Sequence, residues 1–592
     1  MNKLSQKFAW LDRCLFSIAG PILEKELRVC SRHKRNYLLR FVFVMLLTAL
    51  VAGAWFLGGS VPGFKGAGGP LFQASRMAEV GRRVSVAIVL FQFVATQIAA
   101  AAMLSTAISE EVNSRTLAML MTTPISSVQI VIGKLLSRLL HVVLLMAISL
   151  PLLSIIRVLG GVPWDYVVSS LCVTFAAAVF VASASLFFST HRRQANIVIA
   201  DVAVVCLILY VGVPLLLHLL QLRYDLPVEI GRISPYLSPA YFMLENTRVV
   251  DNPALATQLA AWPVLCGVTL LGAAFFLTLT ISSLRTLALR QAMNEPGFLE
   301  SVKKRRASNA RNNARPEQAQ PIRRVKGPPL IWRELKRPLA RTTRLKTLIG
   351  TTLAVAVILA AYVTCIYTGW IGETGAHVAF VVGYMLVGLF RTASASATSL
   401  TSEKESGALP ILLTTPLHPT EIITGKILGS FLKAWPVWVL LLAHILSFIL
   451  IRYIHPFAAF AIPLLTLAGG LLVSAMGVFL SSCFRRSSSA TTVQLLLLLV
   501  FCMPFCCPLP AYLASPIVIG AIVMAGTAGP VAAVRPLGGL HYPLRLWGEQ
   551  GGVAIQMVAI LTIAVIYLLI AFVFFALAGA NLRKRIFHNG SK

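Results

Sequence analysis

The chain has 592 residues, of which 57% are hydrophobic and 12% are charged, and its mean hydropathy is +0.80. An average soluble chain is about one-quarter charged, so this composition excludes a soluble enzyme, a disordered chain and a disulfide-stapled secreted protein. A formal net charge of +31 would suggest nucleic-acid binding in a soluble protein, but the cations here lie almost wholly between apolar blocks. The composition therefore predicts a polytopic membrane protein.

Twelve apolar blocks of about 20 residues, the length that crosses a bilayer as a helix, follow one another along the chain. Backbone groups in lipid must be paired within their own segment, so each block is expected to be a helix and the fold all-α. The predicted spans lie near residues 39–58, 84–107, 139–160, 167–190, 197–220, 263–284, 347–369, 376–400, 427–451, 458–483, 491–512 and 553–580.

The distribution of lysine and arginine predicts how these spans are oriented. When both termini are placed in the cytoplasm, 40 of the 52 cations fall in the loops or at the span ends of that side, and 10 fall on the opposite side. Cytoplasmic loops of membrane proteins carry an excess of these residues. The sequence therefore predicts cytoplasmic termini.

A long polar stretch, residues 285–346, divides the chain into two halves. It has few apolar residues and dense basic runs, which is typical of a flexible linker that also touches anionic lipid. Nucleic-acid binding is the alternative, but no aromatic platform accompanies the charge, so no nucleic-acid partner is expected. The predicted organisation is an N-terminal segment with an elbow helix (1–38), a first six-span half (39–284), a basic linker with a second elbow helix (285–346), a second six-span half (347–580) and a basic tail (581–592).

The two halves repeat each other in the same order and orientation. Residues 21–28 (PILEKELR) resemble 329–336 (PLIWRELK), each just before a basic cluster and a span. A longer match pairs 111–124 (EVNSRTLAMLMTTP) with 403–416 (EKESGALPILLTTP), and in both halves a Gly-Lys pair follows it. Such parallel repeats pack about an axis along the membrane normal, with any pathway at their interface.

The longer match predicts a helix–Thr-Thr-Pro–helix segment in each half, here called the knuckle (residues 111–129 and 403–421). Apolar residues at i, i+3 and i+4 form one stripe on a short helix, and the residue before proline is pushed out of the helical region. Ser126 with Gln129 is a capping-box pattern for the next helix, and His418 with Glu421 is a weaker version. A plain elbow that turns the chain back into lipid is the simpler alternative, but it would not need nearly the same polar sequence twice.

These features together resemble the permeases of type-2 ATP-binding cassette (ABC) exporters, with two permease halves fused in tandem. The resemblance covers nearly the whole chain and includes the elbow before the first span and the basic pairs at 192–193 and 485–486. It departs at Arg115, where glycine is usual, and at Ala408, where threonine is usual. It implies the transmembrane permease subunit of an ATP-driven exporter, which forms the translocation pathway for an unknown exported substrate. It also implies that the chain lies in a plasma membrane, the inner membrane of a bacterium.

In that family a short loop helix, the coupling helix, docks on a separate ABC ATPase subunit and carries its motion to the spans. The resemblance implies such ATPase-coupling roles for Glu111, Thr116, Leu117, Leu120, Thr122, Thr123, Pro124, Glu403, Leu409, Leu412, Thr414, Thr415 and Pro416. The sequence itself contains no G-x-x-x-x-G-K-[ST] phosphate loop. The chain is therefore expected not to be an enzyme and to bind no cofactor directly, using ATP only through its partner. A non-transporting membrane scaffold, or a regulatory protein descended from such permeases, is the alternative function.

A few other residues are candidates for more than packing. Asp201 and Arg391 fall deepest within the predicted spans, where ionisable groups are costly and often mark pathways or helix pairs. They are candidate intramembrane polar sites, with snorkelling as the simpler alternative. The sulfur-rich segment 502–507 suggests Cu(I), but prolines interrupt it and buried cysteine usually only packs, so no metal is expected. His141 and His444 have no acid–base partner nearby in the sequence.

Overall fold

The computed structural model describes most of both halves and one of the two elbow segments fully. The described residues are 23–26, 28, 34–59, 70–113, 116, 125–192, 194–214, 217, 236–251, 262–292, 328–336, 344–372, 374–451, 453–454, 456–502 and 553–589. Within them the regular secondary structure is helical. The first elbow segment is therefore described only in part, and most of the predicted linker lies outside the described residues.

Each of the twelve predicted spans contains a helix. In the first half these are α2 (Lys34–Gly59), α3 (Pro70–Leu104), α6 (Ser127–Gly160), α7 (Trp164–His191), α8 (Ala195–Leu207) with its π-helical continuation η1 (Ile208–Gly212), and α12 (Trp262–Ala292). In the second half they are α15 (Arg344–Tyr367), α16 (Thr374–Ala397), the pair α19 (Pro419–Leu432) and α20 (Trp435–Leu450), α21 (Ala458–Cys483), α22 (Ser487–Cys502) and α26 (Val553–Asn589).

Their length and composition agree with a membrane protein. Seven of the described helices are long and apolar enough to cross a bilayer, and α19 with α20, bent by 51° at the break between them, is an eighth candidate if the pair is counted as one span. Shorter apolar helices, at 40–49, 197–210, 355–367 and 487–499, occupy the four remaining predicted spans. The bend follows from Pro436 in the first turn of α20, because proline lacks the backbone donor that would continue the helix from α19.

The two halves are parallel repeats, as predicted. The helices α6 and α19 begin at Ser127 and Pro419, 292 residues apart, and α8 and α22 begin with the same spacing. Tertiary hydrogen bonds repeat as well: the backbone N–H of Ile108 donates to Ser189 Oγ at 3.2 Å, and that of Leu400 donates to Ser481 Oγ at 2.9 Å. The repeat is thus one of structure, not only of sequence.

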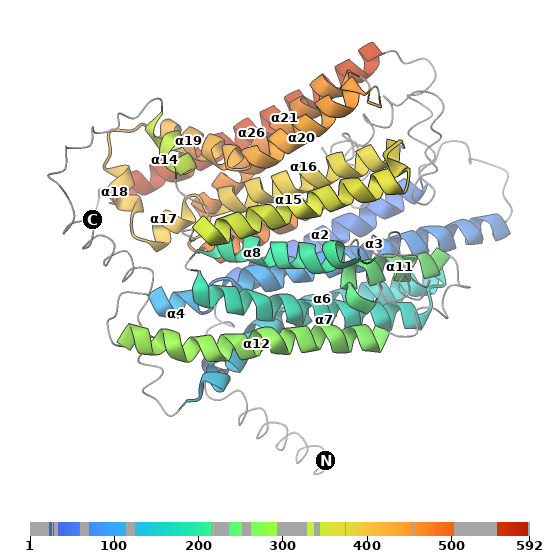
Figure 1. The fold of residues 1–592 in the computed structure, drawn as a ribbon, viewed down its shortest axis with the longest axis horizontal. Helices are drawn as coiled ribbons and strands as arrows, with labels where there is room; N and C mark the ends of the chain where they lie inside the picture. Colours follow the sequence, from blue (N-terminus) through green and yellow to red (C-terminus); the bar gives the residue numbers. More distant parts are fainter. Residues whose placement is uncertain are drawn as a thin grey trace, which may run out of the picture.

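The halves lie side by side, with first-half helices in blue to green and second-half helices in yellow to red (Figure 1). At the seam between them, α22 of the second half packs against α3 and α2 of the first. Leu496 of α22 is fully buried in the first-half core, and Ala102 and Ile199 of the first half join the second-half core. The seam is therefore a shared apolar core centred on α22.

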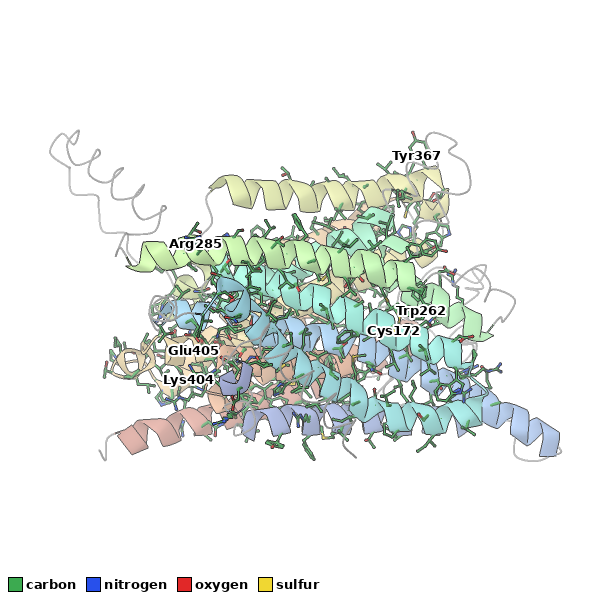
Figure 2. All side chains as sticks on the ribbon, turned by 90° about the horizontal axis from the view of Figure 1, so that it is seen from below. Cys172, Trp262, Arg285, Tyr367, Lys404 and Glu405 are labelled. Carbon is green, nitrogen blue, oxygen red and sulfur yellow. The ribbon has the colours of Figure 1, made fainter. Side chains whose placement is uncertain are left out.

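Both ends of the bundle can be recognised in Figure 2. Arg285, Lys404 and Glu405 lie at one end, here called the knuckle end, whereas Trp262 and Tyr367 lie at the other, here called the far end. The short helices α4 (Ser109–Asn113), α14 (Pro329–Lys336), α17 (Thr401–Glu405) and α18 (Leu409–Leu413) all lie at the knuckle end (Figure 1). The chain is thus a multi-pass helical membrane protein whose repeated polar loops gather at one end.

Candidate functional site at the knuckle end

The knuckle of the second half has the predicted helix–Thr-Thr-Pro–helix form. Its two short helices, α17 and α18, are joined through Gly407, whose φ of +69° lies in the left-handed region that favours glycine. The chain leaves the helix after Leu413, and α19 begins at Pro419. The knuckle therefore projects a five-residue helix from the end of the bundle.

Side-chain caps fix where the next helix starts in both halves. Gln129 N–H donates to Ser126 Oγ at 3.2 Å, while Ser126 N–H donates to Gln129 Oε1 at 3.0 Å, which completes the predicted capping box. In the second half, His418 N–H donates to Glu421 Oε2 at 3.3 Å. Both predicted caps are confirmed, so the direction of each returning helix is set locally.

The two faces of α18 have opposite environments. Leu409 and Leu412 are buried in a core cluster of the second half, at 8% and 5% exposure. Ile411, between them, is 71% exposed. The stripe formed by Leu409 and Leu412 therefore faces the chain's own core and not the outer surface of the knuckle. The surface that α18 presents instead consists of Pro410, Ile411, Thr414 and Pro416.

A buried lysine holds the base of this knuckle. The Lys426 side chain, on α19, has no exposed surface, and its ammonium donates to Glu334 Oε1 at 2.7 Å and to Glu403 Oε1 at 2.7 Å. Its third donor reaches the carbonyl of Ser399 at 3.1 Å. An ammonium has three N–H groups, so every donor is satisfied. One side chain thereby joins the elbow helix α14, the knuckle helix α17 and the end of the second span.

Two further cations complete this cluster. Arg333 Nη2 lies 3.1 Å from Glu403 Oε1, and Lys433 Nζ lies 2.6 Å from Glu334 Oε2. Burial alone would raise the pKa of Glu334, but Lys426 and Lys433 outweigh it and lower that pKa to about 2. The Glu403 side chain is 2% exposed, and its ion pairs are with cations of its own chain.

The first half repeats the cluster in a more open form. Lys134 Nζ lies 3.0 Å from Glu111 Oε1 and 3.4 Å from Glu26 Oε1, and Thr116 donates its hydroxyl to the Glu111 carboxylate. The Glu111 and Glu26 side chains are 20% and 16% exposed, against 2% and 4% for their counterparts. Of the other predicted coupling residues in this half, Leu117, Leu120, Thr122, Thr123 and Pro124 lie outside the described residues.

Glycines let the elbow helix lie directly on α19. A Cβ added at Gly425 would come 2.8 Å from Leu330 Cβ, and one added at Gly429 would come 2.8 Å from Glu334 Cβ. Small residues spaced by four on one helix face allow two helix backbones to approach closely. Steric fit and ion pairing therefore fix α14 at the same place.

The other predicted polar residues lie elsewhere. Asp201 Oδ2 accepts a hydrogen bond from Arg192 Nε at 2.9 Å, so it joins α8 to the residue after α7, which favours a helix pair. Arg391 is partly buried in α16, and no hydrogen bond or ion pair to it occurs among the described residues. His444 Nδ1 lies 2.6 Å from Tyr362 Oη, a contact across 82 residues that the sequence did not reveal.

The metal hypothesis gains no support from the part of the chain that is described. Within that part, no three His, Cys, Asp or Glu side chains lie close enough to hold a metal ion. Of the sulfur-rich segment 502–507, the structure describes Cys502 alone, at the end of α22. The candidate functional site is therefore the knuckle end, where the repeated polar residues lie.

Comparison with protein families agrees with the two-half organisation. Residues 21–284 match a family model described as "ABC-2 family transporter protein", and residues 372–580 match a second model with the same description. Neither the search of curated proteins nor the search of solved structures finds a match. The two family matches lie in tandem, one on each repeat.

Proposed function

Because the chain belongs to the ABC-2 transporter family, we propose that it is the transmembrane permease subunit of an ATP-driven exporter. Both six-span halves lie in one chain, so a single copy supplies both walls of a pathway along their seam. Membership of this family implies partnership with ABC ATPase subunits. ATP is bound and hydrolysed on that partner in this proposal, and the permease converts the partner's motion into rearrangement of the spans.

The exposed face of α18 is the observation that carries this proposal. Ile411 is a large apolar side chain, 71% exposed, at the end of the bundle and not on a predicted lipid-facing span. Exposed apolar patches outside the lipid mark protein contacts. Pro410, Thr414 and Pro416 are exposed around it. This face is the docking surface for the ATPase, and Ile411 is its apolar anchor.

The buried clusters have a different part in coupling. Glu403 and Glu111 are held by Lys426 and Lys134 of their own halves. They act as internal anchors that keep each knuckle attached to its span, and do not contact the ATPase directly. Thr116 supports Glu111 in the same way through its hydroxyl. A push on α18 is thereby passed to the third and second spans.

The knuckle end faces the cytoplasm in this proposal. The excess of lysine and arginine on that side supports the orientation, because basic loops are retained in the cytoplasm. ATP is also available there to the docked ATPase. In this proposal both termini are cytoplasmic, and the membrane is a plasma membrane, the inner membrane of a bacterium.

Co-purification tests the proposal and separates it from a scaffold role. The full chain, tagged and expressed with a cassette ATPase from the same genome, should retain the ATPase, and hydrolysis should change when the permease is reconstituted in nanodiscs. Binding without any effect on hydrolysis would indicate a scaffold. Absence of binding to every cassette ATPase of that genome would contradict the proposal.

A further inference from the structure

Three consecutive charged residues on the second knuckle helix each reach a different helix. Glu403 pairs with Lys426 of α19, Lys404 contacts the end of α21, and Glu405 contacts the start of α22. All three lie on α17, and Figure 2 shows Lys404 and Glu405 together at the knuckle end. The short helix α17 is therefore a junction between the docking helix α18 and three spans.

The contact made by Lys404 holds the end of α21. Its ammonium donates to the carbonyls of Ser481 at 2.5 Å, Ser482 at 2.8 Å and Phe484 at 2.8 Å. The last carbonyls of a helix have no partner within it and carry a partial negative charge, so a cation there is favourable. This contact anchors α17 to the end of the fourth span.

The contact made by Glu405 holds the start of α22. Its carboxylate accepts the backbone N–H of Ser487 at 2.6 Å and the Ser487 hydroxyl at 2.7 Å. Ser487 is the first residue of α22, and the first N–H groups of a helix lack partners within it and favour a negative charge. A side chain on the knuckle thus grips the end of the fifth span in two places.

The helix gripped in this way is the one that forms the seam between the halves. Leu496, on α22, is buried in the core of the first half. At the knuckle end, Arg486 Nη1 also lies 3.1 Å from Glu110 of α4 in the first half. A displacement of α17 therefore acts on the seam through Glu405 without passing through another span.

The first half provides an internal comparison, because its residues differ at both positions of this link. At the constant spacing of 292 residues, Asn113 stands where the second half has Glu405, and Ala195 stands where it has Ser487. Ala195 has no hydroxyl, and it still begins the helix α8. The fifth span of this fold can therefore form without a Glu405–Ser487 contact. The presence of this contact in the second half must then be explained by a role other than forming the helix.

We propose that Glu405 is a positioning residue that couples the second knuckle directly to the seam helix α22, so that the two halves respond unequally to the ATPase. This inference rests on the proposed function and deepens it. When the ATPase moves α18, the carboxylate of Glu405 carries that movement to Ser487 and shifts α22 against α3. The first half has Asn113 and Ala195 at these positions, so it has neither the carboxylate nor the hydroxyl of this link.

The test replaces the link by the residues of the first half. The variants are Glu405→Asn and Ser487→Ala, singly and together, in the full chain bound to its ATPase. Ser406→Ala is the matched control, since its hydroxyl donates to the Glu403 carbonyl and not to α22. Glu405→Gln tests rescue, because an amide still offers an oxygen to the Ser487 N–H.

Spin labels on the two halves report changes in the distance between the halves, and the measurement does not need the transported substrate. Cysteines replacing Val158 and Tyr367, both exposed at the far end of different halves, are labelled in a chain whose native cysteines are replaced. The distance between the labels is measured by pulsed electron paramagnetic resonance, once without nucleotide and once with ATP plus vanadate. In the wild type, Ser406→Ala and Glu405→Gln, the distance between the labels should change when nucleotide is added. Glu405→Asn and Ser487→Ala should bind the ATPase normally but should not show this change in distance.

Two contrary outcomes are distinguishable. If the Asn and Ala variants bind the ATPase and shift as the wild type does, the positioning role of Glu405 is wrong while the proposed function stands. If the wild type itself binds no ATPase, the proposed function fails before the inference is reached. A loss of ATPase binding in the Asn and Ala variants would also overturn the inference, because Glu405 would then act in docking.

Discussion

The Lys426 ammonium lies 2.7 Å from the Glu403 carboxylate, and Lys134 makes the same contact with Glu111 at 3.0 Å in the other half. Each pair is separated by 23 residues and joins the knuckle to the start of the third span. Both pairs also include a glutamate from an elbow helix, Glu334 or Glu26. The repeat has thus kept a buried polar junction, which costs desolvation unless every group is paired.

Replacing Lys426 should damage the second half far more than replacing Lys134 damages the first. Lys426→Met leaves Glu334 and Glu403 buried without their shared cation, and breaking a buried pair in this way costs about 3–5 kcal/mol. Lys134→Met should cost less, because Glu111 and Glu26 are partly exposed to solvent. Thermal unfolding of both variants in the same detergent measures the difference.

A neutral version of the cluster is the control for this first prediction. Glu334→Gln and Glu403→Gln, added to Lys426→Met, remove the two buried carboxylate charges that have lost Lys426 and should recover part of the lost stability. Equal losses for Lys426→Met and Lys134→Met would show that burial does not set the strength of the two clusters.

Acid should weaken the second elbow contact through Glu334. Burial by itself would raise the pKa of this residue, but Lys426 and Lys433 lower it to about 2 from an ordinary value of 4.5. A carboxyl with a lowered folded pKa contributes stability above its unfolded pKa and loses it as the pH falls towards its folded pKa. The unfolding temperature of the wild type should therefore fall as the pH drops below about 4.5.

Glu334→Gln isolates that contribution from the other acids of the chain. The variant should be less stable than the wild type at neutral pH, and the gap between them should narrow as the pH approaches 3. A gap that stays constant over this range would mean that the ionised form of Glu334 does not stabilise the fold.

A side chain at Gly429 should push the elbow helix off α19. A Cβ there would lie 2.8 Å from Glu334 Cβ, and overpacking of this kind costs about 1–3 kcal/mol. Gly429→Ala should lower the unfolding temperature, whereas Gly383→Ala, at a helical position with nothing within 4 Å, should not. If both variants unfold like the wild type, α14 does not depend on close approach.

The orientation of the bundle can be tested with two exposed positions at opposite ends. Thr368 lies beyond the end of α15 at the far end, and Ser406 lies in the second knuckle. In a chain without native cysteines, an impermeant thiol reagent applied outside cells should label Thr368→Cys and spare Ser406→Cys. The excess of basic residues at the knuckle end is the reason for this expectation. The reverse pattern of labelling would mean that the knuckles face outward.

The sequence predicted the helices well, because a span is defined by local properties. Apolar length located a helix in each of the twelve predicted spans, and cap residues such as Ser126 located a helix start. Apolar length alone missed the break after Leu432, since the block from 427 to 451 is apolar on average, although Lys433 and Pro436 lie at the break.

The site was harder to predict because its geometry depends on residues far apart in the chain. Periodicity showed that Leu409 and Leu412 share a face, but it could not show that this face meets the chain's own core. Glu334 and Lys426 are 92 residues apart, and no local pattern brings them together. The repeated glutamates and lysines were visible in the sequence, and only the structure paired them.

Docking of the ATPase on the exposed face of α18 is the central claim, and one affinity comparison tests it. The two substitutions are Ile411→Asp on α18 and Ile451→Asp just beyond α20 at the far end, where the isoleucines are 71% and 59% exposed. The account predicts that Ile411→Asp weakens binding of the co-purified ATPase by at least about tenfold, or roughly 1.4 kcal/mol, and that Ile451→Asp leaves it unchanged. Wild-type affinity in the Ile411→Asp variant would contradict the account.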